Sequence, residues 1–183
     1  MSLAAPSHLL PPAPHPQSPP PGTALPMHYS GCFACGELAC GLRLRFTTGE
    51  GVSVHGVFQV DPRHQGAPGL AHGGLIAAAF DEALGALQVF TREPAVTASL
   101  QTEFRRPVPV GTTLHLMCRL DGRDGRKLWV SGDAHLDDPD GPIAAQATAL
   151  FLTVPLDHFA RHGRTAEVEA AKSELRGRRE VNP

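Results

Sequence analysis

The sequence HGGLIAAAFDEALGAL, residues 72–87, decides the fold of this chain. From Leu75 on, nearly every side chain is apolar or small, which predicts a helix that is buried on most of its surface. The helix begins at Gly73-Gly74, where free amides and the positive end of the helix dipole favour an anion or a developing oxyanion. Asp81 follows about two turns later, on nearly the same face. Because a carboxylate among apolar side chains is costly unless it is compensated, Asp81 marks a candidate site.

Alternating apolar residues predict strands on both sides of this helix. Two strands precede it, at residues 42–46 and 52–61, with a turn at Gly49-Glu50-Gly51 between them. Four more follow, at residues 95–106, 112–121, 127–137 and 143–154, separated by turns rich in Gly, Pro and Asp. Strands joined by such short turns pair antiparallel. The predicted fold class is therefore α+β, an antiparallel β-sheet wrapped around one long central helix.

The length of 183 residues favours one domain with two tails. Residues 1–26 contain nine of the 18 prolines and are predicted to be a disordered, proline-rich arm. Residues 27–155 form the expected domain. Residues 156–183 form a polar tail, in which residues 165–176 have the pattern of a surface helix.

Composition excludes several classes of partner. A formal net charge of −2 gives no reason to expect nucleic acid or an anionic membrane surface. No apolar run approaches the roughly 20 residues of a membrane helix, and residues 1–26 lack the pattern of a secretory signal. The four cysteines do not resemble a disulfide framework, so we expect a reduced, cytoplasmic protein.

The segment Gly69-Leu-Ala-His-Gly-Gly74, followed by Asp81-Glu82-Ala83, resembles the PaaI-like branch of the hotdog-fold acyl-CoA thioesterases. Members of that branch carry an HGG turn before the long helix and an acid nine positions after the His. The resemblance covers roughly residues 32–154 and is strongest in residues 66–85. It implies a hotdog fold, an acyl-CoA substrate with no cofactor beyond the coenzyme A of that substrate, and a homodimer, possibly a dimer of dimers.

Thioester hydrolysis needs charge stabilisation on the carbonyl oxygen and a group that delivers water. The amides of Gly73 and Gly74 are predicted to supply the first, and Asp81 the second. However, Gly74 and Asp81 lie about 10 Å apart along one helix, whereas both groups should lie about 3 Å from the reacting atoms. Two antiparallel copies of the helix would bring the Gly end of one to the Asp of the other. We therefore expect a two-fold dimer with two sites across its interface.

Two further residues are candidates for this site. Glu82 is the competing acid, and it points about 100° away from Asp81 around the helix. The resemblance implies a role for Thr97, because related enzymes carry a Ser or Thr on this strand that holds the attacking water. Thr is also an ordinary strand residue, so a purely structural role for Thr97 stays open.

Five more residues are candidates for substrate binding. His72 is expected to contribute its backbone and a capping contact. Some relatives place a carbonyl-binding Asn in the preceding loop, where this chain has Gly66, so Gln65 and His64 become candidates for that contact. Arg105 and Arg106 could meet the coenzyme A phosphates.

The segment from His28 to Cys40 allows two interpretations. His28, Cys32, Cys35 and Cys40 could supply four zinc ligands. However, no second Cys-x2-Cys follows, and the segment also resembles a packed structural turn of the thioesterase branch. We favour the packed turn and assign no metal, with a zinc-dependent module as an alternative. Cys118 is expected in the core.

The sequence contains no G-x-S-x-G motif, so a serine-nucleophile hydrolase is not supported. The main alternative to a thioesterase is a non-catalytic hotdog protein that binds an acyl-CoA or an aromatic ligand.

Overall fold

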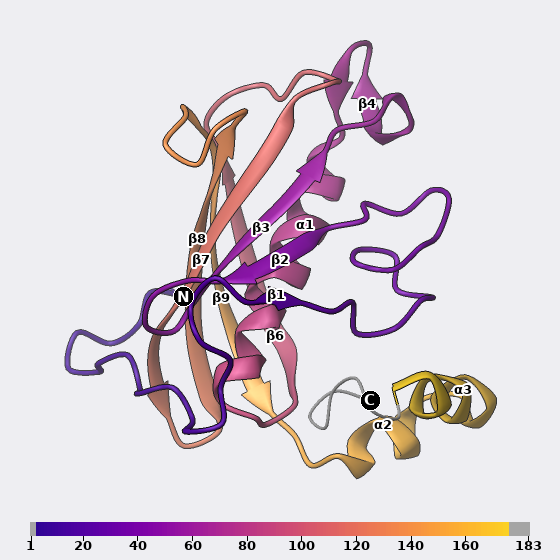
Figure 1. Ribbon diagram of the computed structural model, residues 1–183. Helices are drawn as coiled ribbons and strands as arrows, with labels where there is room; N and C mark the ends of the chain where they lie inside the picture. Colours follow the sequence, from indigo (N-terminus) through magenta and orange to yellow (C-terminus); the bar gives the residue numbers. More distant parts are fainter. Residues whose placement is uncertain (1–2, 176–183) are drawn as a thin grey trace.

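A computed structural model describes residues 3–175. Its main feature is a seven-stranded antiparallel sheet, in the order β1-β2-β3-β7-β8-β9-β6, that wraps around the helix α1 (Gly73–Gly85) (Figure 1). The strands are β1 (Ala24–Leu25), β2 (Arg45–Thr48), β3 (Ser53–Gln59), β6 (Ala95–Phe104), β7 (Thr113–Asp124), β8 (Lys127–Leu136) and β9 (Ile143–Thr153). A 3-10 turn η1 (Pro62–His64) and a small hairpin of β4 (Gln65–Ala67) and β5 (Leu70–Ala71) lead into α1. The predicted arrangement of one helix within an antiparallel sheet is confirmed.

The core lies between α1 and the inner face of the sheet. Ala79, Phe80 and Ala83 of α1 are fully buried there. The 3-10 helix η2 (Ala86–Phe90) continues directly from α1. By length and composition alone, the helical stretch Gly73–Phe90 would be apolar enough to cross a membrane. In this fold its apolar side chains cover the concave face of the sheet instead, which explains why the stretch is so hydrophobic.

The first predicted strand, at residues 42–46, begins later than expected. The Leu42 and Leu44 amides donate hydrogen bonds to Phe33 and Ala34, in the turn that contains the cysteines. Arg43 has a φ of 56°, which is not compatible with a strand. Apolar residues alternate through the whole of residues 42–46. The backbone, however, pairs with another strand only from Arg45 on.

β6 forms one end of the sheet. It pairs with β9 on one side, and within the described chain no strand covers its other side. The pairing shifts register between Thr97 and Ser99, which indicates a β-bulge at Ala98. Most of β6 is exposed to solvent. Such a long, open edge strand is a template for pairing with another chain.

The proline-rich segment contacts the domain, which differs from the free arm that its composition predicts. Ala24 and Leu25 pair with β2, so the sheet begins just before the predicted boundary at residue 27. Further back, the His15 amide donates to the Phe90 carbonyl at 2.8 Å. The edge of β2 leaves backbone groups unpaired, and an extended proline-rich chain can bond to them without forming a core of its own.

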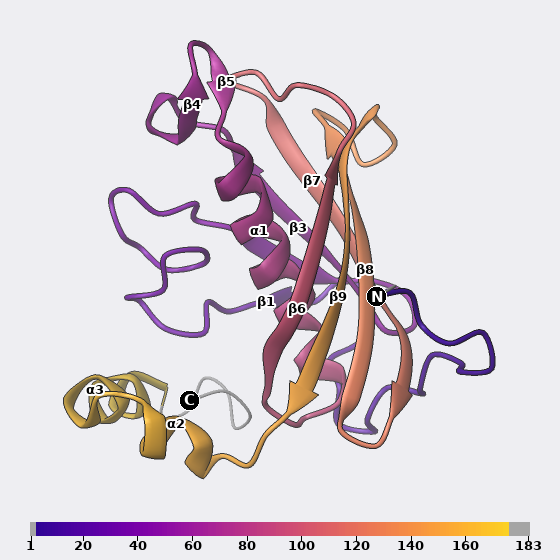
Figure 2. The same cartoon turned by 180° about the vertical axis from the view of Figure 1, so that it is seen from behind.

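The C-terminal segment is helical, as its pattern suggested, with α2 (Asp157–His162) and α3 (Thr165–Leu175) beyond the end of β9 (Figure 2). Its last predicted helical residue, Arg176, lies outside the described residues. The Glu174 carboxylate accepts hydrogen bonds from the backbone and hydroxyl of Ser30, at 2.9 Å and 2.8 Å. This contact brings α3 beside the cysteine-containing turn.

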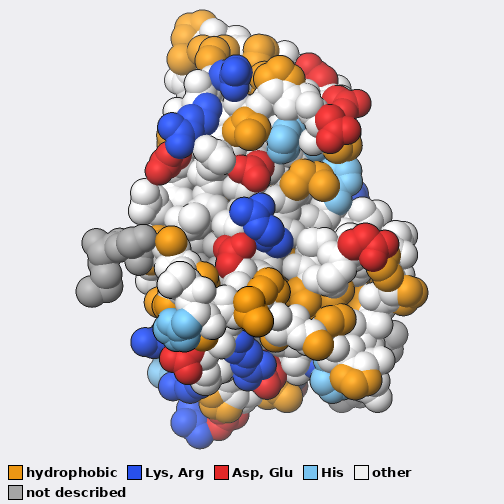
Figure 3. Space-filling view, turned by 90° about the vertical axis from the view of Figure 1, so that its left-hand side faces the viewer, with side chains coloured by type: hydrophobic (Ala, Val, Ile, Leu, Met, Phe, Trp, Pro, Cys, Tyr) orange, Lys and Arg blue, Asp and Glu red, His pale blue; other side chains and the backbone are white. Residues whose placement is uncertain are grey.

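Charged side chains of both signs are mixed on the face of the molecule seen in Figure 3. On β7 and β8, Arg119 lies 3.2 Å from Asp121 and 3.7 Å from Asp133. These partly exposed pairs contribute little to stability, because water screens them.

Candidate active site

Asp81 and Thr97 form a hydrogen-bonded pair between the central helix and the edge strand. The Thr97 hydroxyl donates to Asp81 Oδ1 at 2.7 Å. The bulge at Ala98 lies directly beside Thr97, in the position where bulges often re-aim a side chain at an active site. Asp81 is partly buried and Thr97 is exposed, so solvent reaches the pair. The fold thus brings together two candidates that lie 16 residues apart in the sequence.

This pair lines a cavity of about 260 Å³. Apolar walls come from Val96, Phe151 and Phe159, the last of which belongs to α2. His28 and Glu82 add polar groups to the same lining. Carboxylate and hydroxyl oxygens in a cavity that also has apolar walls can orient a water molecule toward a bound acyl group.

The start of α1 has the expected cap. His72 is the N-cap residue, and its Nδ1 accepts the Gly74 N–H at 2.9 Å. The Gly74 amide therefore already has a partner. Among the residues that the structure describes, the Gly73 N–H has none, which makes Gly73 the stronger candidate to bind an oxyanion.

A second hollow, of about 340 Å³, lies at this helix start. Its lining includes Gly73, Ile76, Phe104, Arg105 and Arg106. A Cβ atom on Gly73 would lie 3.2 Å from the Phe104 ring, so the glycine allows this close approach. The Phe104 side chain is 55% exposed, which is unusual for a large aromatic residue.

Arg105 and Arg106 are exposed at the edge of this hollow. Arg105 forms an ion pair with Glu103 and donates to Gln146 at 3.1 Å, while Arg106 donates to the Ile143 carbonyl at 2.6 Å. Both guanidinium groups retain further donors that face solvent. In a single chain, therefore, the Gly73 hollow and the Asp81 cavity are two separate places on the same helix.

His64 and Gln65 face their own loop. His64 is only 3% exposed, its Nδ1 accepts the Asp61 N–H at 3.0 Å, and its Nε2 has no hydrogen-bond partner. The Gln65 amide donates to Pro62 at 2.8 Å and accepts from Gly69 at 2.7 Å. Neither residue lines the two cavities described above. Their side chains bond instead to the backbone of η1 and of the β4–β5 hairpin.

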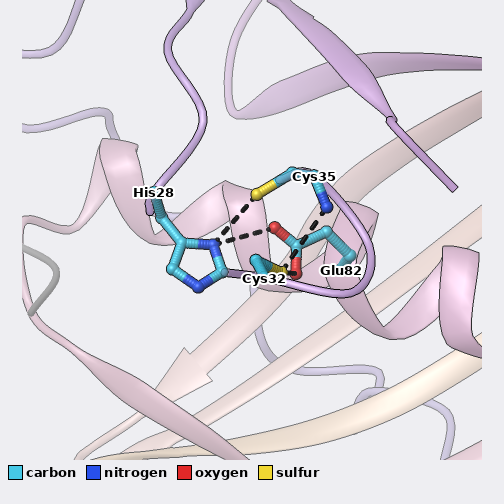
Figure 4. A group of neighbouring side chains, drawn as sticks. All are labelled: His28, Cys32, Cys35 and Glu82. Carbon is cyan, nitrogen blue, oxygen red and sulfur yellow. Dashed lines mark hydrogen bonds and ion pairs between the residues drawn. The ribbon is translucent and has the colours of Figure 1, made fainter. Parts of the chain in front are cut away.

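Glu82 points into a group of side chains with His28, Cys32 and Cys35 (Figure 4). Glu82 Oε1 lies 3.1 Å from His28 Nδ1, and Oε2 lies 3.6 Å from Cys32 Sγ. The sulfur of Cys35 lies 3.1 Å from the same His28 nitrogen. Cys40, which was the fourth predicted zinc ligand, is exposed and outside this group. Sequence reasoning did not connect Glu82 to the cysteines, since only the chain's tertiary path places them together.

Mutual contacts perturb the ionisation of this group. Burial disfavours a charged His28, but hydrogen bonds with Cys32 and Glu82 raise its pKa from 6.5 to about 9. A hydrogen bond from Cys35 lowers the pKa of Cys32 from 9.0 to about 5, although burial opposes this. The same bond, together with burial, raises the pKa of Cys35. Burial would raise the pKa of Glu82, yet its hydrogen bond with His28 lowers it.

Comparison with known proteins agrees with this architecture. A family model described as the thioesterase superfamily matches residues 68–141. The acyl-coenzyme A thioesterase THEM4 of Bos taurus is 38% identical over 96 residues, which are 52% of this chain and 39% of that protein. A putative esterase of Pseudomonas aeruginosa is 31% identical over 96 residues, 51% of this chain and 69% of that protein. The structure of the PaaI protein from the E. coli phenylacetic acid degradation operon superposes with a TM-score of 0.58 at 14% identity, over 62% of this chain and 81% of that one.

The sheet wrapped around a single helix, with an HGG cap at its start, defines a hotdog-fold protein. The chain belongs to the thioesterase superfamily. This confirms the resemblance found in the sequence. The chain spans about two fifths of the length of THEM4, so the relatives share the domain rather than the whole protein.

Proposed function

We propose that this chain is an acyl-CoA thioesterase whose water-activating group is Asp81. The observation that carries this proposal is the 2.7 Å hydrogen bond from Thr97 to Asp81 in the cavity that both residues line. The family of the chain and the name of a relative that is 38% identical support the class of substrate.

In the proposed reaction, Asp81 accepts a proton from a water molecule that the Thr97 hydroxyl helps to hold. The water oxygen attacks the thioester carbonyl carbon, and the carbonyl oxygen becomes an oxyanion. The N–H of Gly73 stabilises this oxyanion at the positive end of α1. The carbon–sulfur bond then breaks as the carbonyl re-forms, and the coenzyme A thiolate leaves and takes up the proton that Asp81 had accepted. The products are a carboxylic acid and free coenzyme A.

The site requires a second copy of the chain in this proposal. Gly73 and Asp81 are separated along α1 by eight residues, or about 12 Å at 1.5 Å per residue, too far to act on one carbonyl group. An antiparallel neighbour would place its Gly73 opposite Asp81. The uncovered edge of β6 and the exposed Phe104 beside Gly73 support a partner at this side of the molecule.

Arg105 and Arg106 fit the coenzyme A portion of the substrate. They lie at the rim of the Gly73 hollow, where the thioester would enter. Guanidinium groups bind phosphate oxygens strongly, often through two parallel hydrogen bonds.

The test is an assay of free thiol release from short-chain, long-chain and aromatic acyl-CoA esters. We expect turnover of at least one ester, and we expect Asp81→Asn to lower kcat by about 10²- to 10⁴-fold. Asp140→Asn, the same change in an exposed turn, is the matched control. Normal turnover by Asp81→Asn would refute the assigned role. Ligand-induced thermal stabilisation without thiol release would favour the non-catalytic binding protein.

A further inference from the structure

Four side chains with metal-binding atoms converge where the turn at residues 28–36 meets α1 (Figure 4). They are His28, Cys32, Cys35 and Glu82, and one ligand atom from each lies within 4.8 Å of all the others. The two cysteines are buried, and the side chains of His28 and Glu82 are only 20% and 19% exposed. The proposed hydrolysis uses none of the four, so the cluster needs an explanation of its own.

The distances in this cluster are close to those of a zinc site. In tetrahedral zinc sites, Zn–S bonds of about 2.3 Å place neighbouring sulfurs roughly 3.8 Å apart, and nitrogen or oxygen ligands somewhat closer. Here His28 Nδ1 lies 3.1 Å from both Glu82 Oε1 and Cys35 Sγ. Cys32 Sγ lies 3.6 Å from Glu82 Oε2. Small side-chain adjustments would therefore complete a tetrahedron.

The backbone of the turn is shaped around the Cys32 sulfur. The amides of Ala34 and Cys35 point at this sulfur, at 3.3 Å and 3.5 Å. The Gly36 amide closes the turn on the Cys32 carbonyl at 3.0 Å, and a Cβ atom on Gly36 would lie 2.3 Å from the Ser30 carbonyl oxygen. Amides that donate to a sulfur favour its thiolate form, which is the form that binds a metal.

The donor set and the irregular segment that carries it give a second reason for a metal here. Two thiols and a carboxylate share this partly buried space with a single imidazole. A metal ion bound here would displace the protons that the imidazole and the thiols hold. Residues 28–44 contain no helix or strand, yet Cys35 is only 2% exposed. A metal would connect this irregular segment to the core helix, as it does in small domains that have few other contacts.

We propose that His28, Cys32, Cys35 and Glu82 bind one zinc ion, which connects the turn at residues 28–36 to α1 next to Asp81. Imidazole, thiolate and carboxylate are ligands that zinc accepts, and four protein ligands make the site structural. The ligand set contains Glu82 in place of Cys40, and the assignment replaces the metal-free turn that the sequence favoured. The proposal does not depend on thioester hydrolysis.

The first experiment measures metal in the full-length chain, purified without chelator and without added metal. We expect about one zinc ion per chain. The protein is then stripped of metal, incubated with Co²⁺ and desalted. Retained cobalt should show thiolate-to-metal charge-transfer absorption and the visible bands of tetrahedral coordination. A chain that holds neither zinc nor cobalt after this treatment overturns the proposal.

The second experiment identifies the ligands by competition with a chromogenic zinc chelator. We expect Cys35→Ser and Glu82→Ala to weaken zinc binding by about tenfold or more. Cys40→Ser is the matched control and should retain normal affinity, because Cys40 is exposed and outside the cluster. Unchanged affinity in Glu82→Ala, or lost affinity in Cys40→Ser, overturns this ligand set. If a variant fails to fold, the metal content and the cobalt spectrum of the natural chain decide whether the site binds a metal.

Discussion

Asp81 and Glu82 are neighbours on one helix, yet they occupy two different chemical environments. Both acids line the cavity of about 260 Å³, but Asp81 accepts a hydrogen bond from the exposed Thr97. Glu82, turned about 100° around the helix, contacts His28 and Cys32 in a compact cluster. The comparison shows that the acid itself does not determine its role. The segment packed against each helix face determines it, β6 for Asp81 and the cysteine-containing turn for Glu82.

The strongest test of this comparison changes each acid separately and measures two properties of both variants. Asp81→Asn should lose about 100-fold or more in turnover and retain its zinc. Glu82→Ala should lose zinc and thermal stability, and its turnover should fall less than that of Asp81→Asn. Thiol release, metal analysis and thermal unfolding give the three readouts. If Glu82→Ala lost more turnover than Asp81→Asn, the assignment of the two acids would be reversed.

A smaller effect is expected at Thr97. Thr97→Val removes the hydroxyl that bonds to Asp81 but keeps the shape of the side chain, so kcat should fall about tenfold, equal to roughly 1.4 kcal/mol in the barrier. Thr97→Ser keeps the hydroxyl and should stay near the natural rate. Equal activity of the Val and Ser variants in steady-state kinetics would assign Thr97 a purely structural role.

Mixed dimers test whether the Gly and Asp ends of α1 act across two chains. Gly73→Val should block the carbonyl site, because even a Cβ atom there approaches the Phe104 ring at 3.2 Å. Neither this variant nor Asp81→Asn should be active alone. Refolded together in equal amounts, the two variants should form mixed dimers as half of all dimers. Each mixed dimer contains one intact site and one site with both changes, so the mixture should recover about a quarter of the natural rate. No recovery, with dimers verified by light scattering, would contradict a shared site.

The smallest effect is expected far from both acids, at His55 and His115 on β3 and β7, whose ring nitrogens lie 3.0 Å apart. Burial, together with the neighbouring His115, lowers the pKa of His55 below its ordinary value of 6.5. His55 therefore binds a proton more readily in the unfolded chain than in the folded chain. The contribution of neutral His55 to the free energy of unfolding is lost as pH falls below 6.5. Between about pH 7 and pH 5, thermal unfolding should show a slightly smaller loss of stability in His55→Gln than in the natural chain. His8→Gln, in the exposed arm, is the control. An identical pH dependence in all three proteins would argue against this contribution.

Much of the architecture was predictable, because periodicity depends on local geometry. Residues 72–87 predicted the core helix, and the period-two segments predicted the strands that surround it. The first strand was misplaced because apolar alternation at Leu42 and Leu44 also occurs in a segment that packs without pairing to another strand. Asp81 was predicted as a carboxylate in an apolar helix and Thr97 through a family resemblance, and the geometry then placed them in contact.

The sequence by itself determined the central helix, its glycine-rich start and the acid two turns later, because each follows from residue type and spacing along one element. Only the tertiary structure decided which of two adjacent acids meets Thr97, that His64 and Gln65 turn into their own loop, and that Glu82 completes a cluster with His28 and two cysteines. These outcomes depend on how distant segments pack against each face of the helix. No local pattern encodes that packing, since residues such as Cys32 and Glu82 are 50 positions apart in the chain and in contact only after folding.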